Sequence, residues 1–157
     1  MNTQFLVQLA TLGPIGKLRP APGTWGSLAG VLSGVALIAI GPFLLEAAII
    51  IISLLGIAAA NAYQATTGKK DASEVIIDEV AGQWIMLLVI PMEPLWILAA
   101  FILFRFLDIT KIGPIGMAEK WPGGVGVMAD DIIAGVIGAA LLWGAVMLWG
   151  AEIAIGA

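Results

Sequence analysis

The sequence contains no cysteine and no histidine among its 157 residues. The absence of cysteine excludes a disulfide framework and a thiolate nucleophile. The absence of histidine excludes histidine-ligated zinc sites, Ser-His-Asp triads and phosphohistidine relays. Any metal binding or catalysis by this chain must therefore use oxygen ligands, together with hydroxyl groups and the cations of lysine and arginine.

Charged residues are also scarce. They make up 11% of the chain, whereas 61% of the residues are hydrophobic and the mean hydropathy is +1.05. This composition is far more apolar than that of a soluble domain, so we predict a single all-α integral membrane domain over residues 1–157, a polytopic helical bundle in the lipid bilayer. The net charge of −4 supplies no positive field for nucleic acid, so a nucleic-acid partner is not expected.

Five apolar stretches are candidate membrane-associated helices, although a complete span needs about 20 residues and some of these stretches are shorter. They cover residues 25–40, 43–61, 75–90, 95–107 and 132–149. Breaks that contain glycine, proline or charged residues separate them. Residues 1–15 lack the positive start of a signal peptide and predict a helix that lies on the membrane surface.

Threading the five stretches through a bilayer in alternation places all seven basic residues on one face. The opposite face receives only Glu46, Glu93 and Glu152, so eight of the eleven acidic residues share the basic face. Lysine and arginine gather on the cytoplasmic side of bacterial inner-membrane proteins. We therefore expect a multi-pass protein of the bacterial inner membrane, with a polar site that faces the cytoplasm.

The first polar segment, residues 16–27, leads into the first apolar stretch. Its Gly-rich backbone lies beside the cations Lys17 and Arg19 and the hydroxyls of Thr24 and Ser27, a combination that could hold a phosphate at a helix N-terminus. The alternative is an ordinary turn in which Thr24 caps the helix. The segment alone does not decide between the two interpretations.

The second polar segment, residues 71–82, has Asp78 and Glu79 directly after three consecutive apolar residues. Capping of the following helix would explain Ser73 or Glu74, but it does not explain the deeper pair. Carboxylates at or below the membrane interface are costly when they are unpaired, so they indicate a functional site. We therefore favour a functional role for Asp78 and Glu79.

The third polar segment contains Arg105, Asp108 and Lys111, which are three residues apart and share one face of a helix. They could form a ladder of ion pairs along that helix. They could equally present a carboxylate to a metal ion and two cations to a phosphate. The two interpretations are compatible with each other.

The fourth polar segment, residues 123–135, has Asp130 and Asp131 after a Gly-rich stretch. They could cap the last helix, but one carboxylate would suffice for that, so we favour a divalent-cation ligand. Oxygen ligands without imidazole or thiolate favour Mg²⁺, with Ca²⁺ and Mn²⁺ left open. A polar cap on an apolar bundle then implies a substrate with a phosphate head and an apolar tail.

The four segments, in this order and nearly at these separations, resemble the phosphatidylglycerophosphatase A family. The resemblance covers residues 16–138. It rests on Ala21-Pro22-Gly23-Thr24-Trp25-Gly26-Ser27, on Asp71 with Val75, Asp78, Glu79 and Gly82, on Phe104-Arg105 with Asp108 and Lys111, and on Gly126 with Asp130, Asp131 and Gly135. The family pattern has Phe and Pro where this chain has Leu107 and Ile112, a difference that affects the shape of the loop and leaves the charged atoms in place.

The resemblance implies a Mg²⁺-dependent membrane phosphatase of glycerophospholipid biosynthesis, which converts phosphatidylglycerophosphate to phosphatidylglycerol and inorganic phosphate. The carboxylates expected to bind Mg²⁺ are Glu79, Asp108, Asp130, Asp131 and Asp78, and the first four are also the expected catalytic residues. The side chains expected to bind the substrate phosphate are Lys17, Arg19, Thr24, Ser27, Arg105 and Lys111.

Two other kinds of protein compete with this interpretation. A small cation or proton transporter also carries acids in its membrane helices, but it would distribute them through the membrane depth, often with inverted repeats. A structural membrane subunit leaves the carboxylate pairs unexplained. Close helix packing at Gly126, Gly135 and Gly138 would fit contacts within one chain or between chains, so a homo-oligomer is left open.

Overall fold

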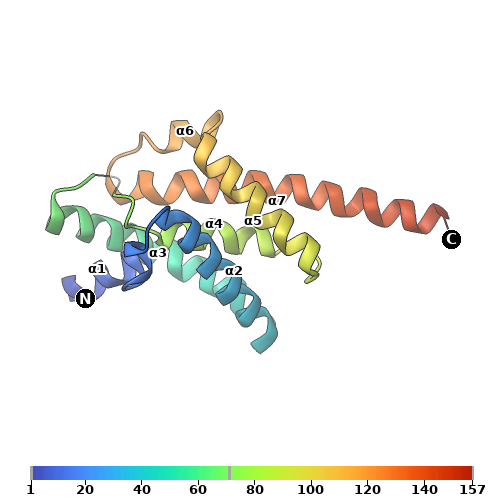
Figure 1. Cartoon of the computed structure of the whole chain (residues 1–157), viewed down its shortest axis with the longest axis horizontal. Coiled ribbons are helices and arrows are strands. Elements are labelled where there is room, and N and C mark those ends of the chain that lie inside the picture. The colour runs from blue at the N-terminus through green and yellow to red at the C-terminus, as the bar shows by residue number, and fades with distance from the viewer. Residues whose placement is uncertain (1, 71, 157) are drawn as a thin grey trace.

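The computed structural model describes residues 2–70 and 72–156, with side chains described as far as residue 149. Over these residues the regular elements are seven α-helices and one short 3-10 helix (Figure 1). They are α1 (Thr3–Thr11), η1 (Ile15–Lys17), α2 (Pro22–Ile40), α3 (Leu44–Thr67), α4 (Ile77–Leu87), α5 (Pro94–Thr110), α6 (Pro114–Ala118) and α7 (Gly123–Gly156). The prediction of an all-α fold is confirmed.

The five apolar stretches correspond to α2, α3, α4, α5 and α7. Three of these helices, over Pro22–Ile40, Leu44–Thr67 and Gly123–Trp149, are long and apolar enough to cross a membrane. By contrast, α4 has 11 residues and extends only about 16 Å at ~1.5 Å per residue, against a hydrocarbon core of about 30 Å. All five predicted membrane-associated helices are thus present. Three of them are long enough to cross a membrane, and the other two, α4 and α5, are shorter.

The short helix α4 lies at the centre of the bundle, between α2 and α7, and packs extensively against both (Figure 1). Most of its residues are buried. Glycines allow this close approach, since a Cβ atom on Gly135 of α7 would lie 2.5 Å from the carbonyl oxygen of Gly82, and one on Gly30 of α2 would lie 3.2 Å from the Cα atom of Val80. The contact at Gly135 is thus made within the chain.

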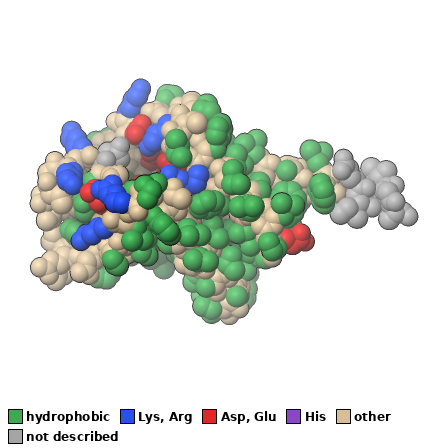
Figure 2. Space-filling model, viewed as in Figure 1, with side chains coloured by type: hydrophobic (Ala, Val, Ile, Leu, Met, Phe, Trp, Pro, Cys, Tyr) green, Lys and Arg blue, Asp and Glu red, His purple; other side chains and the backbone are tan. Residues whose placement is uncertain are grey.

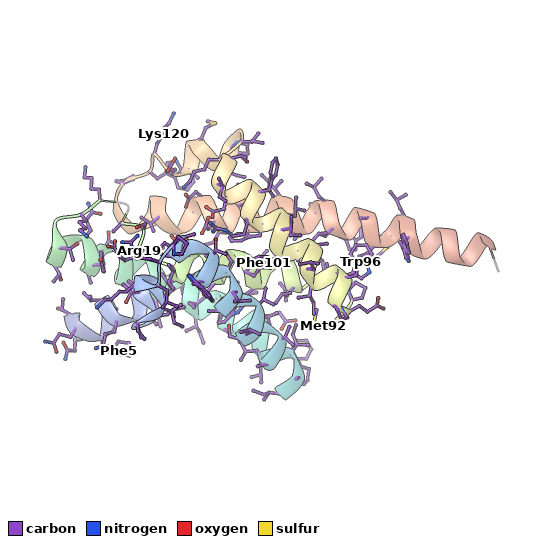
Figure 3. All side chains as sticks on the ribbon, viewed as in Figure 1. Phe5, Arg19, Met92, Trp96, Phe101 and Lys120 are labelled. Atoms are coloured by element: carbon purple, nitrogen blue, oxygen red, sulfur yellow. The ribbon has the colours of Figure 1, made fainter. Side chains whose placement is uncertain are left out.

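Charged side chains gather at one end of the bundle, where α2, α4 and α7 begin and α5 ends (Figures 1 and 2). Figure 3 shows Arg19 and Lys120 toward this end, whereas Met92 and Trp96 lie toward the other end of the bundle. The alternating helix directions thus bring the polar segments of the sequence together, although long apolar helices separate them along the chain.

The N-terminal residues form the helix α1, which packs against α3 and is followed by η1. Ala10 near its end is fully buried, and its carbonyl oxygen accepts a 2.9 Å hydrogen bond from the backbone N–H of Ile76, just before α4. Other side chains of α1, including Phe5, are exposed. The helix expected within residues 1–15 is present, and its location on a membrane surface stays a prediction.

Candidate active site

Three carboxylates from two helices meet at the polar end of the bundle. Asp78 and Glu79 lie in the first turn of α4, and Asp131 lies on the side of α7 that faces them. One oxygen from each carboxylate lies within 4.8 Å of the others. Helix N-termini favour negative charge, so the start of α4 partly offsets the cost of this cluster.

Helix capping does not explain these acids. The residue that precedes α4 is Ile76, which makes no side-chain capping bond, so the interpretation of Ser73 or Glu74 as a cap is wrong. The last helix begins at Gly123, so Asp130 and Asp131 lie in its interior and do not cap it either. Both are buried, with exposed fractions of 4% and 2%.

The last apolar stretch predicts a helix from residue 132, but α7 already begins at Gly123, so its Gly-rich start is helical. The N–H of Gly124 donates a 2.7 Å hydrogen bond to the Asn61 side chain of α3. A Cβ atom on Gly124 would collide with the carbonyl oxygen of Ile57. The glycines thus let α7 begin against α3, which moves the two aspartates two turns into the helix.

A second part of the site comes from α5 and α2. Arg105 Nη1 donates a 2.5 Å hydrogen bond to Asp108 Oδ2 and a 3.4 Å bond to Ser27 Oγ. Ser27 Oγ in turn donates to the Gly23 carbonyl oxygen at 2.9 Å. A Cβ atom on Gly23 would touch Glu79 Oε1 and lie 2.9 Å from Arg105 Nη1, so the start of α2 approaches both side chains.

Lys111 forms the third part of the site. It follows the last residue of α5 and has a left-handed backbone conformation, with φ of 47°. Its side chain pairs with Asp130 and with Glu119, and Lys111 Nζ lies 3.0 Å from Glu119 Oε1. The predicted ion-pair ladder therefore exists between Arg105 and Asp108 and does not continue to Lys111. Burial alone would lower the pKa of Lys111, but its bonds to Asp130 and Glu119 outweigh burial and raise that pKa above its usual range.

Several buried polar atoms at the site have no hydrogen-bond partner among the described residues. They are Glu79 Oε2, Asp131 Oδ1, Arg105 Nε, and both amide atoms of Gln83. The acidic neighbours of Asp131 are Asp78, Asp108 and Asp130, so all five predicted metal ligands surround one region. Buried oxygens without partners require a cation, water or ligand, and a donor set made only of carboxylate oxygens fits Mg²⁺.

Two of the remaining predicted phosphate ligands, Lys17 and Arg19, have other neighbours. Arg19 forms an exposed ion pair with Glu74 at 3.5 Å, and Lys17 lines a cavity of about 480 Å³ beside Tyr63. Glu74 also pairs with Lys69, and its pKa is lowered by its own backbone N–H and then by Lys69. In the part of the chain that the structure describes, no ion pair joins Arg19 or Lys17 to the three clustered carboxylates.

Two more sequence predictions concern Thr24 and Asp71. Thr24 lies in the first turn of α2, whose capping residue is Ala21 with φ of 56°, so the interpretation of Thr24 as a cap is wrong. Asp71, part of the family pattern, lies outside the described residues.

The sequence does not predict a role for Glu119. Its eight-residue separation from Lys111 matches no helical spacing, and the contact between the two residues depends on the turn that joins them.

Comparison with known proteins finds one matching family model and several relatives. The family model described as phosphatidylglycerophosphatase A matches residues 8–146. The phosphatidylglycerophosphatase A of Haemophilus influenzae is 43% identical over 126 residues, which cover 77% of this chain and 76% of the relative. The Escherichia coli protein of the same name is 34% identical over 125 residues, covering 78% and 72%.

A relative from Bacteroides thetaiotaomicron, provisionally named a phosphatidylinositol-3-phosphatase, is 39% identical over 130 residues, covering 78% of this chain and 81% of the relative. No solved structure gives a significant match. The region matched by the family model contains the clustered carboxylates, Arg105 and Lys111. This chain therefore belongs to the phosphatidylglycerophosphatase A family, whose members are phosphatase enzymes.

Proposed function

We propose that this chain hydrolyses phosphatidylglycerophosphate to phosphatidylglycerol and inorganic phosphate, as a step of glycerophospholipid biosynthesis. The observation that carries the proposal is the convergence of Asp78, Glu79 and Asp131 with Arg105 at the start of α2. Carboxylates and a cation at one end of apolar helices suit a substrate whose phosphate is polar and whose tails are apolar. Family membership supports the same activity.

The proposed cofactor is Mg²⁺. Glu79 and Asp131, each with a buried oxygen that lacks a partner, would hold it together with Asp78. Asp108 and Asp130 are paired with cations and lie around the same region, where they would complete the ligand set or act in catalysis. When bound, Mg²⁺ would supply positive charge that stabilises negative charge on the phosphate during hydrolysis.

The chain's own cations would bind and orient the phosphate. Arg105 has an Nε atom without a partner among the described residues, and its Nη1 atom donates to Ser27 Oγ, so Ser27 would hold the guanidinium that binds the phosphate. Lys111, which is paired with Asp130 of α7, would also bind the phosphate. Lys17, Arg19 and Thr24 stay predicted phosphate ligands.

We also propose that the site faces the cytoplasm from a bacterial inner membrane. All seven basic residues belong to polar segments at one end of the apolar helices, as the positive-inside rule expects. The clustering of Asp78, Glu79, Asp130 and Asp131 at that end also disfavours the transporter alternative, which predicts acids along the membrane depth.

The substrate is tested by phosphate release from a panel of lipids in mixed micelles. The detergent-purified protein should release phosphate from phosphatidylglycerophosphate at least about tenfold faster than from phosphatidylinositol 3-phosphate or phosphatidic acid, because a pocket built for one alcohol binds another less well. Release from phosphatidylinositol 3-phosphate alone would replace the proposed substrate with the lipid named for the Bacteroides relative. Cation uptake into proteoliposomes without phosphate release would instead support the transporter alternative.

A further inference from the structure

The short helix α6 fixes Glu119 beside the site. After Lys111 the chain turns at Gly113, with φ of 60°, and α6 returns against α7 (Figure 1). Ile115 and Ala118 of α6 are each 1% exposed, so the helix is held by buried apolar side chains. Glu119 follows directly, and its N–H donates a 3.2 Å hydrogen bond to the Ile115 carbonyl oxygen. The backbone of Glu119 is therefore held in place independently of its charge.

The ammonium group of Lys111 has three N–H donors. Lys111 Nζ donates a hydrogen bond to Asp130 of α7, and it forms an ion pair with Glu119 Oε1, the two atoms lying 3.0 Å apart. The side chain is 28% exposed, so the group is still reached from outside. Two anchors on different elements fix the direction of the third donor, whereas a single anchor at Asp130 would let the ammonium rotate on its flexible stem.

Stability alone does not account for the contact between Lys111 and Glu119. Glu119 is 38% exposed, and exposed ion pairs contribute little to folding. A second carboxylate also gives the group of Lys111, Asp130 and Glu119 a net negative charge, which by itself disfavours an approaching phosphate. Orientation of the lysine is a benefit that offsets this repulsion.

We propose that Glu119 is a positioning residue, which holds the Lys111 ammonium against Asp130 so that its third N–H is presented to an oxygen of a phosphate monoester. The proposal rests on the proposed function, because it takes Lys111 as a phosphate ligand. A competing role is that Glu119 occupies the phosphate position at rest. The two roles predict opposite changes in phosphate affinity.

The test compares Glu119→Ala with Glu119→Asp, and uses Lys120→Ala, a change at the next and exposed residue, as the matched control. Glu119→Ala should raise both the KM for the lipid phosphate and the inhibition constant of inorganic phosphate by about five- to tenfold, as expected when one oriented charge-assisted hydrogen bond is weakened. Glu119→Asp should recover part of the loss. Lys120→Ala should behave as the parent protein.

A double-mutant cycle shows whether Glu119 acts through the lysine. In a Lys111→Ala background, Glu119→Ala should cause no further loss, because the group that it orients is gone. Equal losses with and without Lys111 would overturn the proposal, as would an unchanged KM with a lowered melting temperature. A lower KM or inhibition constant for Glu119→Ala would assign the competing role.

Titration of the same variants with inorganic phosphate, followed calorimetrically, separates this proposal from the proposed function. If the parent protein released no phosphate from any lipid but bound inorganic phosphate more tightly than Glu119→Ala, the positioning role would stand and the proposed substrate would fall. If the parent bound no phosphate in either assay, the positioning role would be overturned.

Discussion

At the scale of single residues, Gly23 occupies the point where α2 meets Glu79 and Arg105. It lies in the first turn of α2, and any side chain there would reach into the space of the Glu79 carboxylate and the Arg105 guanidinium. Those groups are the ends of flexible side chains, so they can move away without disturbing the backbone. A methyl group at this position should therefore affect catalysis more than folding.

We expect Gly23→Ala to lower phosphate release by a factor on the order of 100, because displacement of catalytic groups by about 1 Å has effects of that size. Its melting temperature in detergent should stay close to that of the parent. Gly41→Ala at the other end of α2 is the control, since its Cβ atom would meet only Leu44 Cδ1 at 3.7 Å. Full activity of Gly23→Ala would show that α2 does not contribute to the site.

The carboxylates of the candidate site can be predicted from the sequence, because carboxylates beside apolar runs are costly without a function. The sequence predicts that Asp78, Glu79 and Asp131 act together, and the structure brings one oxygen of each within 4.8 Å of the others. Pairings that depend on a turn were not predictable. The backbone of Lys111 is left-handed at the end of α5, and its side chain pairs with Asp130 and Glu119. Helical spacing in the sequence does not predict these two ion pairs.

At the scale of elements, the separation of α4 and α7 sets the distance between Glu79 and Asp131. Gly82 and Gly135 meet at this contact, and a Cβ atom on Gly135 would lie 2.5 Å from a backbone oxygen and 3.0 Å from the Cα atom of Gly82. Backbone atoms in packed helices cannot move aside cheaply. The two helices would have to separate to accept a side chain.

We predict that Gly135→Ala destabilises the protein by about 1 to 3 kcal/mol, the usual cost of overpacking, and also lowers phosphate release. Thermal melting in detergent measures the first effect. Gly144→Ala in the same helix is the matched control, because its Cβ atom would meet nothing within 4 Å. Melting of Gly135→Ala at or above the parental temperature would contradict the close contact between α4 and α7.

The apolar stretches located α2, α3, α5 and α7 in the sequence, since long hydrophobic runs fix where membrane helices can form. Helix starts were less predictable. Glycine and carboxylates normally indicate a loop or a cap, but in α7 the glycines at 123–126 are inside the helix. The apolar run at 75–90 predicts a longer helix than α4. The run is apolar because the protein buries this segment on several sides, and burial extends beyond the residues that are helical.

At the scale of the whole molecule, charge is concentrated at one end of a largely apolar bundle (Figure 2). The chain has no cysteine, so single cysteines can be introduced and labelled without a background. Lys70→Cys and Lys120→Cys should react with a membrane-impermeant maleimide from the cytoplasmic side, and Glu93→Cys only from the opposite side. Labelling of Glu93→Cys from the same side as Lys70→Cys would contradict the topology.

We propose that the cluster of Asp78, Glu79 and Asp131 binds Mg²⁺ for phosphate hydrolysis. The most direct measurement is phosphate release from phosphatidylglycerophosphate by the purified protein and by Asp131→Asn, in chelator and with Mg²⁺ restored, with Glu46→Gln as a distant control. We predict no release by the parent in chelator, full recovery with Mg²⁺, and a loss of roughly 100-fold in Asp131→Asn at saturating Mg²⁺. Undiminished release in chelator, or parental activity of Asp131→Asn, would contradict Mg²⁺ binding by this cluster.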